Sequence, residues 1–233
     1  MSTGIKKFLL AVVIFGISVA GSSYTLIKKG YTPGADYLNL VEARNFALGG
    51  TYKSEDSKNM FLSSDQLLKT GVITGIPNPL TPIIYGHIFS WFGFNPSVPF
   101  WVSIFLFGLF SVIIFHLTST FFGLISGFFA GIMSALMPSM TIGALYGGLY
   151  EWAMMFFGIA LWLYFSSPKD PFSAHRYKLL GASIFFALAA LARNAFTISF
   201  IPLFVFDFWH NRSIKRSAIL LIPFLAIFVS RIN

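Results

Sequence analysis

Residues 100–117 read FWVSIFLFGLFSVIIFHL, an uncharged and almost wholly apolar run. A helix needs roughly 18 such residues to cross the hydrocarbon core of a bilayer. The run has no period-two alternation of polar and apolar residues, which argues against a strand of a membrane barrel. Backbone groups in lipid must be hydrogen-bonded within their own segment. This stretch therefore predicts a transmembrane helix and, with similar runs elsewhere, an all-α polytopic integral membrane bundle.

The composition agrees with a membrane protein. Of the 233 residues, 56% are hydrophobic and 10% are charged, whereas a soluble domain carries about 25% charged residues. The net charge is +8. Most of the basic residues fall in predicted loops, which favours membrane lipids rather than nucleic acid as partners. Without cysteine, the chain can build neither a disulfide nor a thiolate metal site. No cofactor is expected; a divalent metal is compatible with the sequence, but no motif indicates one.

The apolar runs predict about seven transmembrane helices in a single membrane domain, residues 1–233. The first run has a competing interpretation, a signal peptide with small residues at 18–20. It continues to Ile27, however, and so reaches spanning length. A long polar loop, residues 28–99, follows this run. The predicted spans are residues 8–27, 100–117, 121–137, 149–165, 177–192, 195–209 and 217–230, with a short turn near Thr120.

Lysine and arginine residues near the spans predict the orientation. With the N-terminus in the cytoplasm, the short loops on that side hold many basic residues, whereas residues 139–148, SMTIGALYGG, hold none. Residues 28–99 are then extracytoplasmic. The expected location is the cell membrane (inner or plasma), or the endoplasmic reticulum membrane in a eukaryote. The basic residues predicted to be cytoplasmic are Lys6, Lys7, Lys169, Arg176, Lys178, Arg212, Lys215 and Arg216.

Residues 32–50, TPGADYLNLVEARNFALGG, place charged side chains just after the first run. The apolar positions predict a helix over residues 37–48, which Asp36 would cap. Alternatively, Asp36, Glu42 and Arg44 belong to a polar site at the membrane surface. A second short helix, over residues 83–92, is rich in aromatic residues and is expected to lie in the interface. The two helices could together cover a site at that surface.

Two ionisable residues fall within or beside later spans, Glu151 in GGLYEWAMMFF and Arg193 in ALAALARNAFTI. Such residues are costly in a membrane and often mark function. The alternatives are that Glu151 reaches the interface to pair with a lysine, and that Arg193 extends to lipid phosphates. The topology puts Asp36, Glu151 and Arg193 on one side, which suits a substrate with lipid, phosphate and sugar parts. Asp207 falls on the other side and is interpreted as structural.

Five segments in order carry a family resemblance: DYLNLVEARNFALGG, NPLTPIIYGHIFSWFG, FFGLISGFFAGIMSALMP, GLYEWAMMFFGIALWLYF and YKLLGASIFFALAALARNAFTISFIPLF. The chain resembles the GT-C superfamily of membrane glycosyltransferases, in particular the protein mannosyltransferase and aminoarabinose-transferase-like branch. The likeness covers nearly the whole chain and lies in order and spacing rather than in one sharp motif. The resemblance implies that the seven spans are the family's N-terminal module and that its C-terminal part is lacking.

The resemblance also implies an inverting enzyme that takes a sugar from a polyprenyl-phosphate donor. The acceptor would be a protein, a lipid or a glycan on the extracytoplasmic or lumenal face. Asp36 stands at the position of the family's general base, and Arg193 at that of a basic residue which could serve the donor phosphate. Two positions depart from the family, Tyr37 in place of a second acid and Asn194 in place of proline. The further candidates for the substrate site are Glu42, Arg44 and Glu151.

Two other functions fit the sequence. One is a non-enzymatic flippase or transporter subunit for lipid-linked sugars, and the other is an inactive membrane scaffold. Transporters tend to have two similar halves and helices broken near mid-membrane. This sequence shows no second half, and its candidate polar residues gather at one face instead, so the enzyme is the preferred interpretation.

Overall fold

The structure is a computed structural model that describes residues 2–29, 43, 47, 80–95, 97–137, 149–167, 176–193, 195–211 and 213–229. Within these ranges the structure contains eight helices with described bounds and two further helical residues, Ala43 and Ala47, and it contains no strand. The all-α fold class is therefore confirmed for the described residues. The helices are α1 (Thr3–Lys29), α5 (Leu80–Phe92), α6 (Val98–Phe122), α7 (Leu124–Leu136), α9 (Leu149–Phe165), α10 (Arg176–Ala192), α11 (Ala195–Asn211) and α12 (Ile214–Val229).

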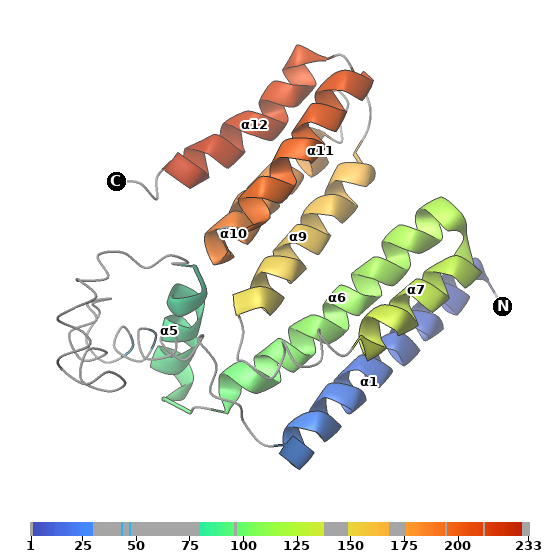
Figure 1. Cartoon of the computed structure of the whole chain (residues 1–233), viewed down its shortest axis with the longest axis vertical. Helices are drawn as coiled ribbons and strands as arrows, with labels where there is room; N and C mark the ends of the chain where they lie inside the picture. Colours follow the sequence, from blue (N-terminus) through green and yellow to red (C-terminus); the bar gives the residue numbers. More distant parts are fainter. Residues whose placement is uncertain are drawn as a thin grey trace.

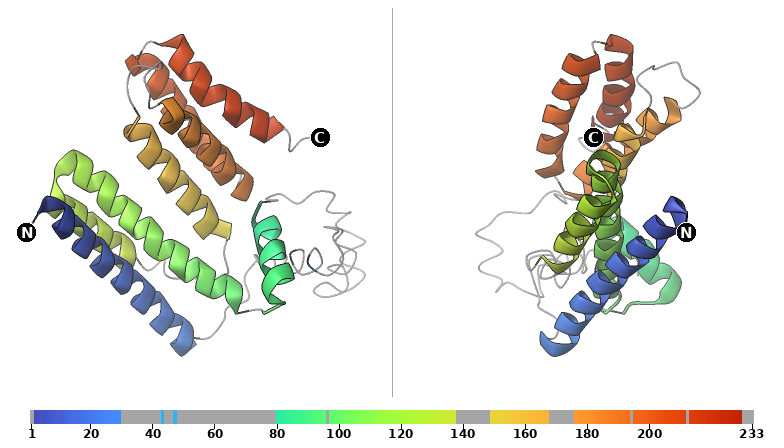
Figure 2. Two further views of the ribbon diagram at one scale, coloured as in Figure 1. Left: turned by 180° about the vertical axis from the view of Figure 1, so that it is seen from behind. Right: turned by 90° about the vertical axis from the view of Figure 1, so that its right-hand side faces the viewer.

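The long helices form two packed groups, as Figures 1 and 2 show. The first group contains α1, α6 and α7, and the second contains α9, α10, α11 and α12, with α10 in contact with the other three. Helix α6 packs against α9 and so joins the two groups. The short helix α5 lies at the end of the bundle where α6 and α9 begin. This end is called the α5 end below.

Two helices are long and apolar enough to cross a membrane, Thr3–Lys28 within α1 and Val98–Phe122 in α6. The apolar helices Leu124–Leu136, Tyr150–Phe165 and Tyr177–Ala192 are shorter than this length. A helix of 17 residues such as α9 spans about 25 Å, below the roughly 30 Å of a hydrocarbon core. Length and composition therefore support two membrane-crossing helices, and the predicted seven-span bundle is not confirmed by them.

The turn after α6 differs from the sequence-based prediction, which put it near Thr120. Helix α6 continues to Phe122, and the hydroxyl of Thr120 donates a hydrogen bond to the carbonyl of His116, one turn back, at 2.8 Å. The chain turns instead at Gly123, whose φ is 88°. Only glycine adopts this backbone region without a steric penalty, so the helix ends at Gly123 and not before it.

Helix α5 begins earlier than predicted, at Leu80 instead of residue 83. Pro82 lies in its first turn, where a missing amide hydrogen does no harm because those amides have no partner within the helix. Of the helix predicted over residues 37–48, the structure describes Ala43 and Ala47, both helical.

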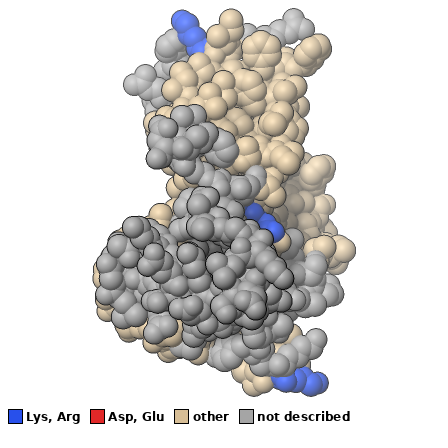
Figure 3. All heavy atoms as spheres, turned by 60° about the vertical axis from the view of Figure 1, so that its left-hand side comes forward, with Lys and Arg blue, Asp and Glu red and all other residues tan. Residues whose placement is uncertain are grey.

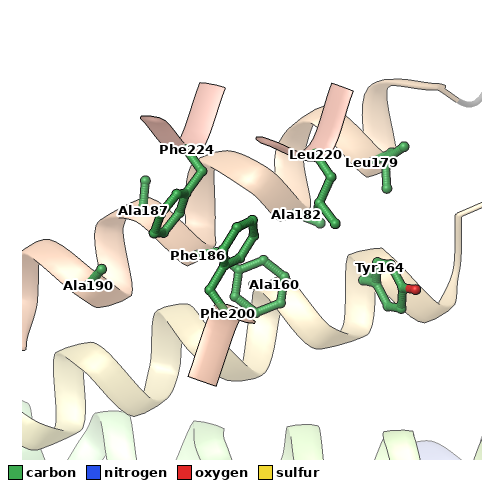
Figure 4. Packing of buried hydrophobic residues seen from close by; sticks show 10 residues of the cluster. All are labelled: Ala160, Tyr164, Leu179, Ala182, Phe186, Ala187, Ala190, Phe200, Leu220 and Phe224. Carbon is green, nitrogen blue, oxygen red and sulfur yellow. The ribbon is translucent and has the colours of Figure 1, made fainter. Parts of the chain in front are cut away.

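The largest apolar core lies among α9, α10, α11 and α12 (Figure 4). The rings of Phe200 and Phe224 stack with centroids 4.0 Å apart and an interplanar angle of 7°. Helix α10 contributes alanines rather than large side chains at several buried positions, so neighbouring helices can approach it closely. These alanines are Ala182, Ala187 and Ala190.

Close helix approach also defines the first group. A Cβ atom added at Gly127 in α7 would lie 2.7 Å from the carbonyl oxygen of Phe115 in α6, and one at Gly131 would lie 2.7 Å from Ile14 Cδ1 in α1. These glycines let backbones pack where a larger residue would separate them, as is common between membrane helices. Helix α1 thus packs against both α6 and α7 and buries Ile14 fully.

Much of the outward surface is apolar. Large hydrophobic side chains are exposed on α1, α6, α7 and α11, among them Phe8, Phe105, Phe129 and Ile198. On the face in Figure 3 the described surface is mostly uncharged, with few basic and no acidic atoms in view. Soluble monomers rarely expose continuous apolar surface on this scale. The outward faces therefore suit contact with lipid.

Candidate functional site

Arg193 occupies the junction of two helices at the α5 end. Its amide donates a hydrogen bond to the carbonyl of Ala189 at 2.9 Å, which completes α10. Its own carbonyl accepts a bond from the amide of Phe196 at 3.0 Å, which opens the first turn of α11. The backbone of Arg193 is thus fixed by both helices, and its side chain leaves the bundle at a defined point.

The guanidinium of Arg193 packs on Tyr150, the second residue of α9. Its Cζ atom lies 3.2 Å from the centroid of the Tyr150 ring, and Nη2 donates a hydrogen bond to the Tyr150 hydroxyl. An arginine on an aromatic face is held by attraction to the ring electrons and by flat stacking. Tyr150 therefore restricts where the guanidinium can go.

Glu151 follows Tyr150 directly and lies in the first turn of α9. The residue is 4% exposed. A carboxylate in the first turn of a helix is stabilised by the positive end of the helix dipole. Two of the residues predicted from sequence, Glu151 and Arg193, are therefore brought to the same end of the α9–α10 pair, with Tyr150 beside both.

Helix α5 packs onto this region through aromatic residues. Tyr85 and Trp152 meet edge to face, with ring centroids 6.4 Å apart and planes at 73°. Tyr85 and Phe89 form a small buried cluster with Ala43, against which Ala47 and Trp152 also pack. Trp152 in the first turn of α9 is thus adjacent to α5, and it packs against the same cluster as Ala43 and Ala47.

The other three predicted site residues, Asp36, Glu42 and Arg44, lie outside the described residues. Ala43 is fully buried against α5, and in the sequence it stands between Glu42 and Arg44. The contacts of Ala43 place this residue at the α5 end.

Three buried polar atoms near the starts of α5, α9 and α11 have no hydrogen-bond partner within the described residues. They are the Thr81 hydroxyl, the indole Nε1 of Trp152 and the Thr197 hydroxyl. A buried donor without a partner is costly, and in native proteins such atoms usually meet water or a ligand. The α5 end therefore offers hydrogen-bonding capacity that the described side chains do not use.

A second polar cluster, which the sequence did not reveal as a unit, lies at the opposite end of α9 and α11. Asp207 is fully buried, and its Oδ1 accepts hydrogen bonds from Tyr164 Oη at 2.8 Å, Asn211 Nδ2 at 2.9 Å and Arg216 Nε at 2.8 Å. Arg216 also donates from Nη2 to Ser167 Oγ at 3.0 Å. The cluster ties together α9, α11 and α12, in agreement with the structural interpretation of Asp207.

Sequence reasoning missed Tyr150 and Trp152 as residues of the candidate site, and it missed Arg216 as the partner of Asp207. Tyr150 could have been noticed as an aromatic residue beside a buried acid at a helix start. The pairing of Asp207 with Arg216 could not have been predicted. His210 lies closer to Asp207 in the sequence, but its ring stacks on Phe206, with ring centroids 5.4 Å apart.

Within the described ranges, no group of three or more His, Asp or Glu residues is placed to hold a metal ion. Comparison with known proteins gives no match: no family model, no curated protein and no solved structure corresponds to this chain.

Proposed function

We propose that this protein is a membrane glycosyltransferase, or the module of one, that takes a sugar from a polyprenyl-phosphate donor. The observation that carries the proposal is the meeting of Arg193, Tyr150 and Glu151 at one end of the bundle beside α5. A cation held on a tyrosine, a buried acid and unused hydrogen-bond donors suit a ligand with both phosphate and sugar groups. The resemblance to GT-C enzymes gives the reaction its type.

In this proposal seven helices cross the membrane and the α5 end faces away from the cytoplasm. The helices α7 and α9–α12 are short for an average bilayer, and local thinning of the bilayer around them accommodates the mismatch. The apolar outward faces support this arrangement. Helix α5 then lies along the outer interface, where its exposed Trp91 and Phe92 meet the headgroup region.

The proposed reaction is an inverting displacement at the anomeric carbon. The acceptor oxygen forms a bond to that carbon, and its proton passes to the carboxylate of Asp36 as general base. The bond from the anomeric carbon to the phosphate oxygen breaks, and its electron pair stays on the phosphate. The guanidinium of Arg193 stabilises the charge that grows there. No metal or cofactor takes part in this scheme.

The position of Arg193 on Tyr150 is compatible with binding a phosphate. Stacking engages the flat face of a guanidinium, whereas phosphate oxygens are bound by the N–H groups along its edge. Tyr150 would thus orient the cation without replacing the phosphate. Glu151, with Glu42 and Arg44, is proposed to contact the sugar or the acceptor.

The test is a transfer assay on membranes that contain the full chain and a radiolabelled polyprenyl-phosphate sugar. We expect Arg193→Ala to lower turnover about a hundredfold or more, since the loss of a group that stabilises charge in the transition state costs about 2.7–4 kcal/mol, a factor of about 10²–10³ in rate. Asp36→Asn should abolish transfer. Unchanged turnover in Arg193→Ala would remove its phosphate role.

The same assay separates the alternatives. Movement of intact donor across the membrane without sugar release would identify a flippase instead. If the folded protein in the membrane neither releases sugar from the donor nor moves the donor across the membrane, the scaffold interpretation is left.

A further inference from the structure

The end of the bundle opposite α5 carries cations where helix dipoles disfavour them. Helices α1, α10 and α12 all begin at this end, and none has an acidic residue in its first turn. Lysines stand there instead, near the positive end of each dipole. We call this the basic end and define it by Lys6, Lys7 and Lys178.

Contacts between helices show that these starts share one end. Lys178 Nζ, at the start of α10, lies 3.5 Å from the Ser166 carbonyl just past α9. Arg216, at the start of α12, reaches Ser167 in the same place. Phe121 and Phe165, near the ends of α6 and α9, have ring centroids 5.0 Å apart. The end of α6 lies beside the start of α1, since α1 and α6 run in opposite directions (Figure 1).

Among the described residues, no acidic side chain pairs with Lys6, Lys7 or Lys178. The described residues include two acidic ones, Glu151 and Asp207. Glu151 lies at the α5 end, and Asp207 is fully buried and paired with Arg216. The side chain of Lys6 is exposed, and those of Lys7 and Lys178 are half-buried. The positive charge of the basic end is therefore presented outward.

Exposed aromatic residues surround the same end. Tyr177 at the start of α10 is 59% exposed, Trp209 near the end of α11 is 78% exposed, and Phe122 at the end of α6 is 75% exposed. Tyrosine and tryptophan prefer the headgroup level of a bilayer. We therefore expect lysines among such residues to lie at the depth of the lipid phosphates.

We propose that the basic end binds the headgroups of anionic phospholipids in the cytoplasmic leaflet. Phosphate oxygens accept hydrogen bonds from the lysine ammonium groups, and the negative lipid charge offsets the unfavourable placement of these lysines at helix N-termini. This inference rests on the membrane location proposed above but not on sugar transfer.

Lys28 provides a matched control on α1 itself. It lies at the α5 end and is exposed, with Nζ 3.4 Å from the Tyr24 hydroxyl. Helix α1 thus carries Lys6 and Lys7 at one end and Lys28 at the other. A substitution of any of these lysines by glutamine removes the charge but keeps most of the aliphatic side chain. A general affinity of lysines for anionic lipid would affect both ends equally, whereas the proposal concerns one end.

The experiment measures lipids retained by the purified full chain by native mass spectrometry, in micelles titrated with phosphatidylglycerol or phosphatidylcholine. The wild type should retain phosphatidylglycerol preferentially, and added salt should reduce the preference. Each of Lys6→Gln, Lys7→Gln and Lys178→Gln should weaken it about fivefold, the factor for about 1 kcal/mol per basic residue near an anionic surface. Lys28→Gln should leave it unchanged, and Lys178→Arg should restore it.

Equal retention of the two lipids by the wild type, or an equal loss in Lys28→Gln, would overturn the proposal. Circular dichroism of each variant confirms that it is folded. Extraction of the protein by high salt without detergent would instead contradict the membrane location itself. Absent transfer activity with intact lipid preference would count against the glycosyltransferase alone.

Discussion

Tyr150 and Arg193 are separated by 43 positions in the chain and yet share a stacked contact. The sequence identified Arg193 as a candidate site residue because it is a cation at a break between two apolar runs. It could not predict Tyr150, since this contact depends on how α9 and α10 pack. Likewise, Asp207 was recognisable as a buried acid, but its partner Arg216 follows from the turn between α11 and α12.

The contact predicts distinct effects of two substitutions at Tyr150. Tyr150→Phe keeps the ring on which the guanidinium packs, so sugar transfer should fall by less than about threefold. Tyr150→Ala removes the ring, and a cation–π contact at an exposed site is worth up to about 1 kcal/mol, so transfer should fall about fivefold. Donor titrations should show the loss mainly as a raised KM. Equal rates in Tyr150→Ala and the wild type would show that the contact does not position Arg193.

Asp207 gives a prediction on stability. Asp207→Asn leaves Arg216, which is 4% exposed, without its counter-charge. The loss of one partner of a buried ion pair costs about 3–5 kcal/mol, so the thermal unfolding midpoint in detergent should drop by several degrees. The double variant Asp207→Leu with Arg216→Met should recover much of that loss.

His210→Gln is the control for this experiment, because His210 is exposed and lies on the same helix. If Asp207→Asn unfolds at the wild-type temperature, the cluster does not stabilise α9, α11 and α12.

At the scale of elements, apolar runs were enough to locate helices but not to fix their ends. Helix α9 begins and ends at the residues expected, 149 and 165, because glycines precede it and serine and proline follow. Helix α6 runs five residues past its expected end at 117, since Thr120 satisfies its hydroxyl within the helix and only Gly123 permits the turn. Whether a helix crosses a membrane depends on its length relative to the bilayer thickness, and for the shorter helices a membrane span stays a prediction.

The packing of α7 on α6 predicts the effect of filling a close approach. Gly127→Leu would push a side chain into the Phe115 carbonyl, and overpacking of this kind costs about 1–3 kcal/mol. The unfolding midpoint in detergent should fall. Gly16→Leu is the matched control, because a Cβ atom there meets nothing within 4 Å, and it should unfold like the wild type. A stable Gly127→Leu variant would mean that α6 and α7 are not closely packed.

The whole molecule has two different ends. The α5 end gathers Arg193, Tyr150 and the buried Glu151, while the other end gathers lysines and the Asp207 cluster. The positive-inside rule predicted Glu151 and Arg193 on one side and Lys6, Lys7 and Lys178 on the other, and in the structure these residues lie at opposite ends of the bundle. The arrangement of α5 over the first turn of α9 could not be predicted, since it arises from the contact of Tyr85 with Trp152.

The account depends most on residues 36 and 193 lying on the same, non-cytoplasmic side of the membrane. The chain has no cysteine, so single cysteines can be introduced without background, at Ala35 and Ala195 for that side and at Ser2 and Ser213 for the other. In intact cells, an impermeant maleimide applied from outside the cytoplasm should label Ala35→Cys and Ala195→Cys, and should label Ser2→Cys and Ser213→Cys only after permeabilisation. Labelling that places positions 35 and 195 on opposite sides would contradict the account.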